Sequence, residues 1–280
     1  MLVDKAPGPT SHDVVARVRR ALGERRAGHT GTLDPFASGL LVVLLGRATR
    51  IARFVEQREK GYLAVARLGL RTTTDDVTGE PMTGTPVPVS DARLTEALAR
   101  LSSQVEQRPP TFSARQVGGQ RSYRLARQGR APELPPRAIT VHSLELLGRD
   151  GADVTFRTVV SPGTYVRAMA RDLGEMLGTG AHLTALRRET IGTLRVEDAT
   201  PMDQLDAGTE ILPPLAMVSH LPQRQVDADG AVAISHGRPV AAANALPGEW
   251  PVALVQGGRL LAIAERVDDW LRPRVVLEEA

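Results

Sequence analysis

Apolar residues near the N-terminus recur at helical spacing. The recurrence begins after Ser11 and stops at Gly23, and its members are Val14, Val15, Val18 and Leu22. Serine is a favoured N-cap residue and glycine commonly follows a helix, so we predict a helix over this stretch with Ser11 as its cap. The unbroken apolar run from Leu40 to Leu45 fits both a buried strand and the start of a core helix.

The middle of the chain alternates predicted strands and helices. Four segments have the β-branched content of strands, and they are Tyr62–Leu68, Ile139–Leu147, Val154–Val160 and Thr190–Val196. Helical spacing recurs twice, first through Leu94, Leu98 and Leu101, and then through Tyr165, Val166, Met169, Leu173 and Met176. Since the elements interleave without a regular βαβ repeat, the pattern favours an α+β fold.

The C-terminal part has a pattern of its own. Periodicity is lost from Met202 to Pro222, which makes this stretch the best candidate for a linker. Beyond it, two apolar runs, Val252–Val255 and Leu260–Ala264, flank Gly257-Gly258, as in a β-hairpin. We therefore predict a main domain over residues 1–222 and a small β-rich domain over residues 223–280.

Composition excludes several kinds of site. The chain has no cysteine, which rules out disulfides, thiolate nucleophiles and cysteine-bound zinc, and none of its six histidines forms a metal-ligand pair at helical spacing, so we expect no metal. The N-terminus carries charges where a signal peptide needs an apolar core, and the longest apolar run is far shorter than the roughly 18 residues of a membrane span. We expect a cytoplasmic protein that does not bind membranes.

The positive charge is almost all arginine and is unevenly distributed. Only Lys5 and Lys60 are lysines among the 35 cationic residues, and residues 201–280 hold six arginines against eleven acidic residues. The basic part is therefore the first 200 residues. Seven arginines and two glutamates lie between Val105 and Thr140, a balance that suits phosphate contacts, although a solvated surface loop would look the same.

One turn carries a candidate catalytic carboxylate. Residues 28–41 read GHTGTLDPFASGLL, and three glycines in this stretch indicate tight turns or close approach of the backbone. Pro35 disfavours helical conformation at Asp34, so this carboxylate should stand on a rigid turn. The motif lacks the sequence of a phosphate-binding loop. On composition alone, the sequence favours an ordinary Asp-Pro turn with capping glycines.

The fourteen residues GHTGTLDPFASGLL are similar, nearly letter for letter, to the catalytic motif of the TruB family of pseudouridine synthases. Four flanking segments also resemble family motifs in the family's order, namely DKAPGPTSHDVV, KGYLAVARLGLRTTTDDVTGE, RPPTFSARQVGGQRSYRLARQG and SPGTYVRAMARDLGEMLGTGAHLTALRRETIG. Ala6 stands where the family usually has proline. The resemblance covers nearly all of residues 1–195.

This resemblance implies an α+β pseudouridine synthase domain with a mixed sheet and a set of site residues. Asp34 would be the essential carboxylate and Arg167 its ion-pair partner, which would orient it and keep it ionised. Tyr62 would stack on the target uracil, Tyr165 would lie near the base and help to move its C5 proton, and Leu186 would line the pocket. Without the family, the tyrosines and Leu186 would be interpreted as packing residues and Arg167 as half of a surface ion pair.

Three further residues resemble family positions near the substrate. His29 would pack into the RNA loop, although a histidine before a Thr-Gly turn is more often a loop hydrogen-bonder. Asp76 would be an acidic residue close to the site, with a loop-capping aspartate as the alternative. Lys5 would support the active-site loop more than it would contact RNA.

The resemblance also implies a substrate, the uridine of the tRNA T-loop at position 55, isomerised without cofactor or guide RNA by a monomer. The basic stretch 105–140 would hold the T-arm, and GRLLAIAERVDDWLRPRVVL resembles the end of a PUA-type module. The alternatives are a guide-dependent synthase acting on ribosomal RNA, an RNA-folding protein with lost or incidental catalysis, and a glycosidase with Asp76 as second carboxylate.

Overall fold

The computed structural model describes residues 1–82, 84, 88–113, 116–117, 120–122, 125, 128, 130, 134–242 and 250–277. Part of the basic stretch 105–140 therefore lies outside the described residues. Strands and helices interleave without a βαβ repeat, as predicted, and form two main sheets. The chain is α+β.

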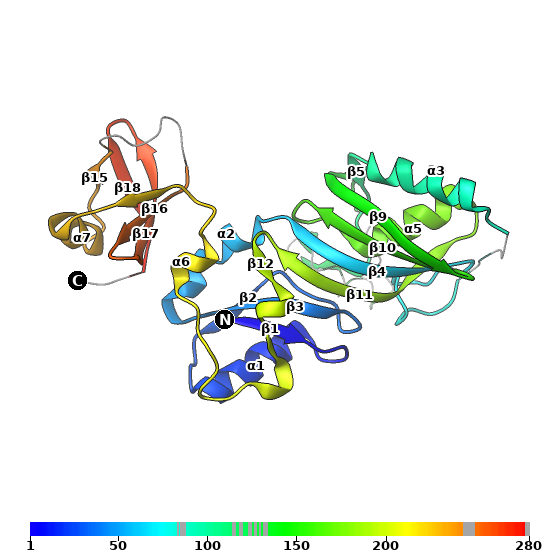
Figure 1. The fold of residues 1–280 in the computed structure, drawn as a ribbon, viewed down its shortest axis with the longest axis horizontal. Coiled ribbons are helices and arrows are strands. Elements are labelled where there is room, and N and C mark those ends of the chain that lie inside the picture. Colours follow the sequence, from blue (N-terminus) through cyan, green and yellow to red (C-terminus); the bar gives the residue numbers. More distant parts are fainter. Residues whose placement is uncertain are drawn as a thin grey trace.

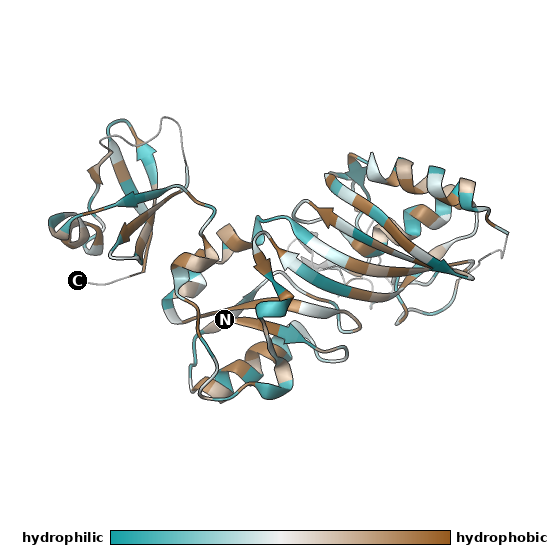
Figure 2. Cartoon of the chain, in the orientation of Figure 1, coloured by the Kyte–Doolittle hydropathy of each residue, from teal (hydrophilic) through white to brown (hydrophobic). Residues whose placement is uncertain are grey.

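A nine-stranded mixed sheet organises the first two-thirds of the chain (Figure 1). Its strand order is β13-β1-β3-β11-β4-β10-β9, with β2 added beside β3 and β12 beside β11. The strands are β1 (Leu2–Lys5), β2 (Ala27–Thr30), β3 (Ser38–Leu45), β4 (Lys60–Leu68), β9 (Val141–Asp150), β10 (Asp153–Val160), β11 (Ala181–Ile191), β12 (Leu194–Arg195) and β13 (Thr200–Pro201). Hydrophobic and hydrophilic residues alternate along β10, as expected for a strand with one buried face (Figure 2).

The apolar run that the sequence left ambiguous is strand β3. Its alternate residues belong to two different cores, with Leu41 and Val43 in one and Leu40, Val42 and Leu44 in the other. A strand that is buried on both faces needs no polar alternation, which explains the unbroken apolar run.

Helices α1 (Ser11–Leu22), α3 (Asp91–Ser102) and α5 (Val166–Leu177) pack on the first of these cores. We had predicted Ser11 as the N-cap of α1, but the N-cap is Thr10. The Thr10 hydroxyl accepts a hydrogen bond from the Asp13 amide, and the Asp13 carboxylate accepts one from the Thr10 amide. Ser11 is the first helical residue, and its hydroxyl bonds to the main chain of Leu33 instead. The helix ends at Gly23 in the left-handed conformation, as predicted.

The prediction of a strand at Thr190–Val196 was wrong. The chain reverses at Gly192, which has a φ of 56°, and residues 190–195 are the tip of a hairpin between β11 and β12. The long strand that precedes the tip, β11, was missed because its polar and arginine-rich sequence does not have a strand's apolar pattern.

A second, five-stranded sheet lies at the other end of the molecule from α3 and α5 (Figure 1). It contains β14 (Gln223–Gln225), β16 (Val252–Gln256), β17 (Arg259–Val267), β18 (Trp270–Val276) and β15 (Val240–Ala241), and α7 (Ala228–Ser235) packs beside it. The predicted hairpin at Gly257-Gly258 is confirmed as β16 and β17. The stretch 202–222 is not an exposed linker, because its Met217, Val218 and Leu221 are buried between the two sheets.

The remaining elements are short. They are the 3₁₀ helices η1 (Gly46–Ile51), η2 (Val196–Asp198) and η3 (Met202–Gln204), the helices α2 (Ala52–Glu56) and α6 (Pro214–Met217), and the strand pairs β5 (Glu106–Gln107) with β8 (Arg137–Ala138) and β6 (Gln116–Val117) with β7 (Gln120–Arg121). None of the helices in the described ranges is long and apolar enough to cross a membrane.

Candidate active site

Asp34 stands on a turn between β2 and β3. Its carbonyl accepts a hydrogen bond from the Ala37 amide, which closes a four-residue turn with Pro35 at the second position, a favoured place for proline. The Asp34 side chain keeps 35% of its surface exposed, so it can still meet a substrate. We call residues 31–37 the Asp34 loop.

Side chains from three other elements hold the carbonyls of this loop. Ser11 donates to the carbonyl of Leu33, Arg188 donates to that of Gly31, and the Lys5 ammonium donates to those of Pro35 and Ala37 at 3.2 and 2.6 Å. Lys5 has no exposed surface and its third hydrogen bond goes to the Ala6 carbonyl. It therefore lies beneath the loop, and burial lowers its pKa to about 8 although Asp34 attracts its charge.

Arg188 brings β11 against the start of β3. Its guanidinium donates to the carbonyls of Gly31 and Leu40 and is fully buried. The two strands approach so closely that a Cβ on Gly39, which has a φ of 101°, would lie 2.3 Å from the Arg188 carbonyl oxygen. Only glycine fits this position. Arg188 was not predicted as a site residue, because an arginine in a polar strand is usually solvated.

Arg167, at the start of α5, pairs with Asp34. Its Nε lies 2.9 Å from Oδ2 of Asp34, and Nη2 donates to Oδ1 at 3.3 Å. The same guanidinium donates to the carbonyls of Thr74 and Phe112 at 2.7 and 2.8 Å and lies 3.4 Å from Oδ2 of Asp76. With only 5% of its side chain exposed, Arg167 is fixed by four neighbours, which in turn fixes the orientation of the Asp34 carboxylate.

Burial raises the pKa of the Asp34 carboxyl above its ordinary value. The Arg167 guanidinium and, more weakly, the Lys5 ammonium oppose this effect, whereas the Asp76 carboxylate adds to it. Arg167 therefore opposes protonation of Asp34 without cancelling the effect of burial.

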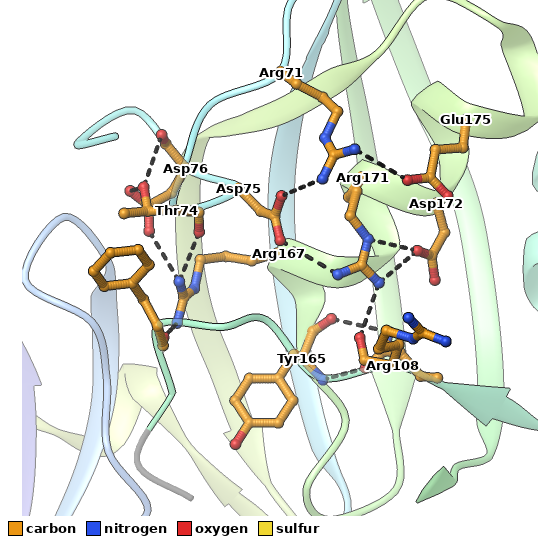
Figure 3. A network of polar contacts seen from close by, with 12 residues as sticks. Arg71, Thr74, Asp75, Asp76, Arg108, Tyr165, Arg167, Arg171, Asp172 and Glu175 are labelled. Carbon is orange, nitrogen blue, oxygen red and sulfur yellow. Dashed lines mark hydrogen bonds and ion pairs between the residues drawn. The ribbon is translucent and has the colours of Figure 1, made fainter. Parts of the chain in front are cut away.

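Asp76 is held inside the loop that follows β4 and does not face solvent. Its Oδ1 accepts hydrogen bonds from the Thr74 hydroxyl and from both the amide and the hydroxyl of Thr78. Its other oxygen faces Arg167 (Figure 3). Asp76 thus both caps its own loop and joins the polar network around Asp34, so the two interpretations drawn from the sequence coexist.

Tyr62 and Leu186 lie on neighbouring strands of the sheet. Tyr62 on β4 pairs with Arg188 on β11, and Leu186 pairs with Ala64, so their side chains share one face. Both are buried in the first core, Tyr62 with 7% and Leu186 with 8% of their surface exposed.

Tyr165 precedes the first residue of α5. Its amide donates to Oε1 of Gln107 and its carbonyl accepts from Nε2 of the same side chain, which fixes the main chain two residues before Arg167. Its ring extends away from the arginine network, as Figure 3 shows.

His29 lies on β2, next to the Asp34 loop. Its ring meets that of His12 edge to face, with 5.3 Å between the centroids, and its buried Nδ1 has no hydrogen-bond partner within the described part of the chain. Burial lowers its pKa to about 4, so the imidazole is neutral at physiological pH.

The described residues thus gather Asp34, Asp76 and Arg167 into one network, with Lys5 beneath it. A cavity of about 690 Å³ is lined by Arg171 and Asp172, among other residues, and Asp34 is not part of its lining. The carbonyls of Thr74 and Phe112 could not have been found from the sequence, because main-chain acceptors carry no sequence signal.

Two family models match consecutive parts of the chain. The model of the TruB family pseudouridylate synthase N-terminal domain matches residues 19–166, and that of the tRNA pseudouridylate synthase B C-terminal domain matches residues 167–212. The matched residues include Asp34, Asp76 and Arg167, and they end before the five-stranded sheet.

Relatives and solved structures agree with these models. The chain is 44% identical to tRNA pseudouridine synthase B of Thermobifida fusca over 99% of its own length and 97% of the relative's, and 40% identical to that of a Mycobacterium species over 100% and 96%. A chain in the crystal structure of a Cbf5-Nop10-Gar1 complex superposes with a TM-score of 0.78 at 27% identity, covering 99% of this chain and 84% of that one. On this similarity and on the network around Asp34, the chain belongs to the TruB family of pseudouridine synthases.

Proposed function

We propose that this protein isomerises a uridine in the T-loop of tRNA, at position 55, to pseudouridine. The observation that carries the proposal is the geometry at Asp34. Its carboxylate is partly exposed, and both carboxylate oxygens face Arg167. The turn that carries Asp34 is fixed by side chains that donate hydrogen bonds to its carbonyls. Similarity over the full length to enzymes named tRNA pseudouridine synthase B supports the substrate.

The reaction is an isomerisation within one nucleotide. The bond from ribose C1′ to uracil N1 breaks, the base turns, and C5 of the base bonds to C1′. The proton on C5 is lost and N1 gains one, so atoms and electrons balance without a cofactor. A carboxylate can serve this reaction as nucleophile toward the sugar or as base toward a ribose proton, and we assign this role to Asp34.

The neighbours of Asp34 suit the other parts of such a reaction. The target base must leave its stack to reach the carboxylate, and an aromatic face can then hold it through stacking worth about 1–3 kcal/mol. We assign this contact to Tyr62, the pocket wall to Leu186 and the transfer of the C5 proton to Tyr165. A neutral His29 beside the loop suits packing against unstacked bases.

We further propose that the stretch 105–140 binds the T-arm of tRNA without a guide RNA, with residues 1–222 as the catalytic domain and 223–280 as a PUA-like domain. The seven arginines of this stretch support phosphate contacts, which makes binding salt-dependent. The five-stranded sheet from Gln223 onward supports the second domain, although its acidic balance argues for few RNA contacts.

Mapping the product tests the proposed function. Unmodified tRNA transcript is incubated with the protein alone, with no guide RNA, and pseudouridine is located by chemical derivatisation and primer extension. We expect one modified position, in the T-loop. Modification elsewhere would overturn the assigned substrate, and binding and refolding of tRNA without modification would favour the RNA-folding alternative.

A further inference from the structure

Helix α5 carries a second arginine one turn after Arg167. Residues four apart lie on the same face of a helix, so Arg171 stands directly beside Arg167. The two arginines face two consecutive aspartates of the loop after β4, because Arg167 meets Asp76 and Arg171 meets Asp75, each at 3.4 Å (Figure 3). We call the contacts of Arg167 the first rung and the contacts of Arg171 the second rung.

Both rungs also reach the same third segment. Arg167 donates to the carbonyl of Phe112 and Arg171 to that of Arg108, again four residues apart. Helix α5, the loop 72–78 and the segment 108–112 are therefore tied together twice. The first rung includes Asp34, whereas in the second the guanidinium of Arg171 is held by Asp75 and Asp172.

Asp75 is the strained member of this arrangement. Its φ is 60°, a left-handed conformation that is uncommon outside glycine, and 5% of its surface is exposed. Its carbonyl accepts a hydrogen bond from the Leu183 amide on β11, so its backbone is anchored to the sheet while its carboxylate reaches Arg171. The position of Asp75 fixes that of its neighbour Asp76, because consecutive Cα atoms are about 3.8 Å apart.

We infer that Asp75 and Arg171 are positioning residues for the catalytic pair. The second rung fixes the loop 72–78 and the segment 108–112 against α5, and so places the Asp76 carboxylate and the Thr74 and Phe112 carbonyls that orient Arg167 toward Asp34. This inference rests on the proposed function. It adds two residues, Asp75 and Arg171, that act through Arg167 and Asp76 and not by direct contact with Asp34.

The experiment compares Asp75→Asn with Glu175→Gln. Glu175 is on α5, one turn after Arg171, and its carboxylate pairs with Arg71 at 3.4 Å. Arg71 also lies 4.0 Å from Asp75, so Glu175 is linked to the second rung only through Arg71. It is the matched control for losing one carboxylate beside this helix. For each folded variant we would measure tritium release from tRNA labelled at uracil C5 in single turnover at saturating enzyme, the Kd for tRNA, and the Tm.

We expect Asp75→Asn to lower the single-turnover rate by about tenfold to a hundredfold, since small displacements of a catalytic group have effects of this size, with Kd changed less than about twofold. Glu175→Gln should leave both near wild type. Arg171→Lys, which keeps the charge and can make fewer hydrogen bonds, is a milder probe if Asp75→Asn does not fold. We expect its rate to fall below that of wild type by less than about tenfold, again with little change in Kd.

An unchanged rate in folded Asp75→Asn or Arg171→Lys, or a change confined to Kd, would overturn the positioning role. A rate loss equal in Asp75→Asn and Glu175→Gln would also overturn it, because it would reflect any lost charge on α5. A wild-type protein that released no tritium would instead overturn the proposed function, so the two failures are distinguishable.

Discussion

The Asp34 loop and the contact between the two sheets are held by opposite kinds of interaction. In residues 31–37, hydrogen bonds from Ser11, Arg188 and Lys5 fix the carbonyls of alternate residues. Between the sheets, an apolar seam is formed by buried side chains from both, including Leu40, Val42, Met217, Val255 and Ile263.

The difference separates positioning from stability. Hydrogen bonds are directional, so buried donors beneath a loop can hold one carboxylate in one orientation. Apolar burial is not directional and grows with the area removed from water. We therefore expect substitutions beneath the loop to change mainly kcat, and substitutions in the seam to change mainly the free energy of unfolding.

Arg167→Met should give the largest effect. It removes the ion-pair partner that Asp34 and Asp76 share, so we expect kcat to fall about a thousandfold, or about 4 kcal/mol. Single-turnover rates of the folded fraction would measure the loss. Arg167→Lys, which keeps one charge, should lie between this variant and wild type, and equal rates for wild type and Arg167→Met would contradict the role of the ion pair.

Ile263→Ala tests the seam. Ile263 has no exposed surface and packs in the core that joins the two sheets, so truncation should lower the free energy of unfolding by about 3 kcal/mol while kcat stays unchanged. Denaturant unfolding would measure the change. Leu261→Ala, on the same strand but in the separate core beside α7, is the control for a truncation away from the seam. A lower kcat in folded Ile263→Ala would contradict the claim that the seam contributes to stability and not to kcat.

Lys5→Met tests the loop itself. Three carbonyls lose a donor, and with partial compensation by water we expect a loss of about 2 kcal/mol in stability together with a fall in kcat of about tenfold. Lys60→Met is the matched control, because the Lys60 ammonium is also buried but donates to the carbonyls of Glu56 and Arg58, outside the loop. If the two variants lost kcat equally, the loop tether would have no special role.

The pH profile tests the environment of Asp34. The carboxylate form is the active one in both mechanisms, and burial raises its pKa, so kcat should fall about tenfold per pH unit below a pKa that lies above the ordinary 3.9 of aspartate. Asp76→Asn removes a carboxylate that raises this pKa, so the acid limb should move to lower pH. A limb that stayed in place would show that Asp34 does not control it.

Much of the site could be predicted because some of its residues indicate the conformation of their own segment of the chain. Pro35 indicated a non-helical turn at Asp34, helical spacing placed Arg167 on a helix, and the family motif joined the two residues. The double-sided burial of β3 was not predictable, since it depends on the second sheet packing against the first.

The parts of the site that were not predicted involve side chains in unusual environments or with unusual partners. Arg188 is a buried cation whose hydrogen bonds go to main-chain carbonyls, and Ser11 bonds to the main chain of Leu33 and not to its own helix. Arg171 and Asp75 become partners only when the loop after β4 folds onto α5. Such contacts depend on tertiary structure, which local sequence patterns do not encode.

The most direct test of the account is tritium release from tRNA labelled at uracil C5, with wild-type protein and with Asp34→Asn. The exchange is nearly isosteric, so tRNA affinity should be retained in the variant. We predict release by the wild type, at the T-loop uridine, and none by Asp34→Asn. Release by Asp34→Asn at the wild-type rate would contradict the assignment of Asp34 as the essential carboxylate.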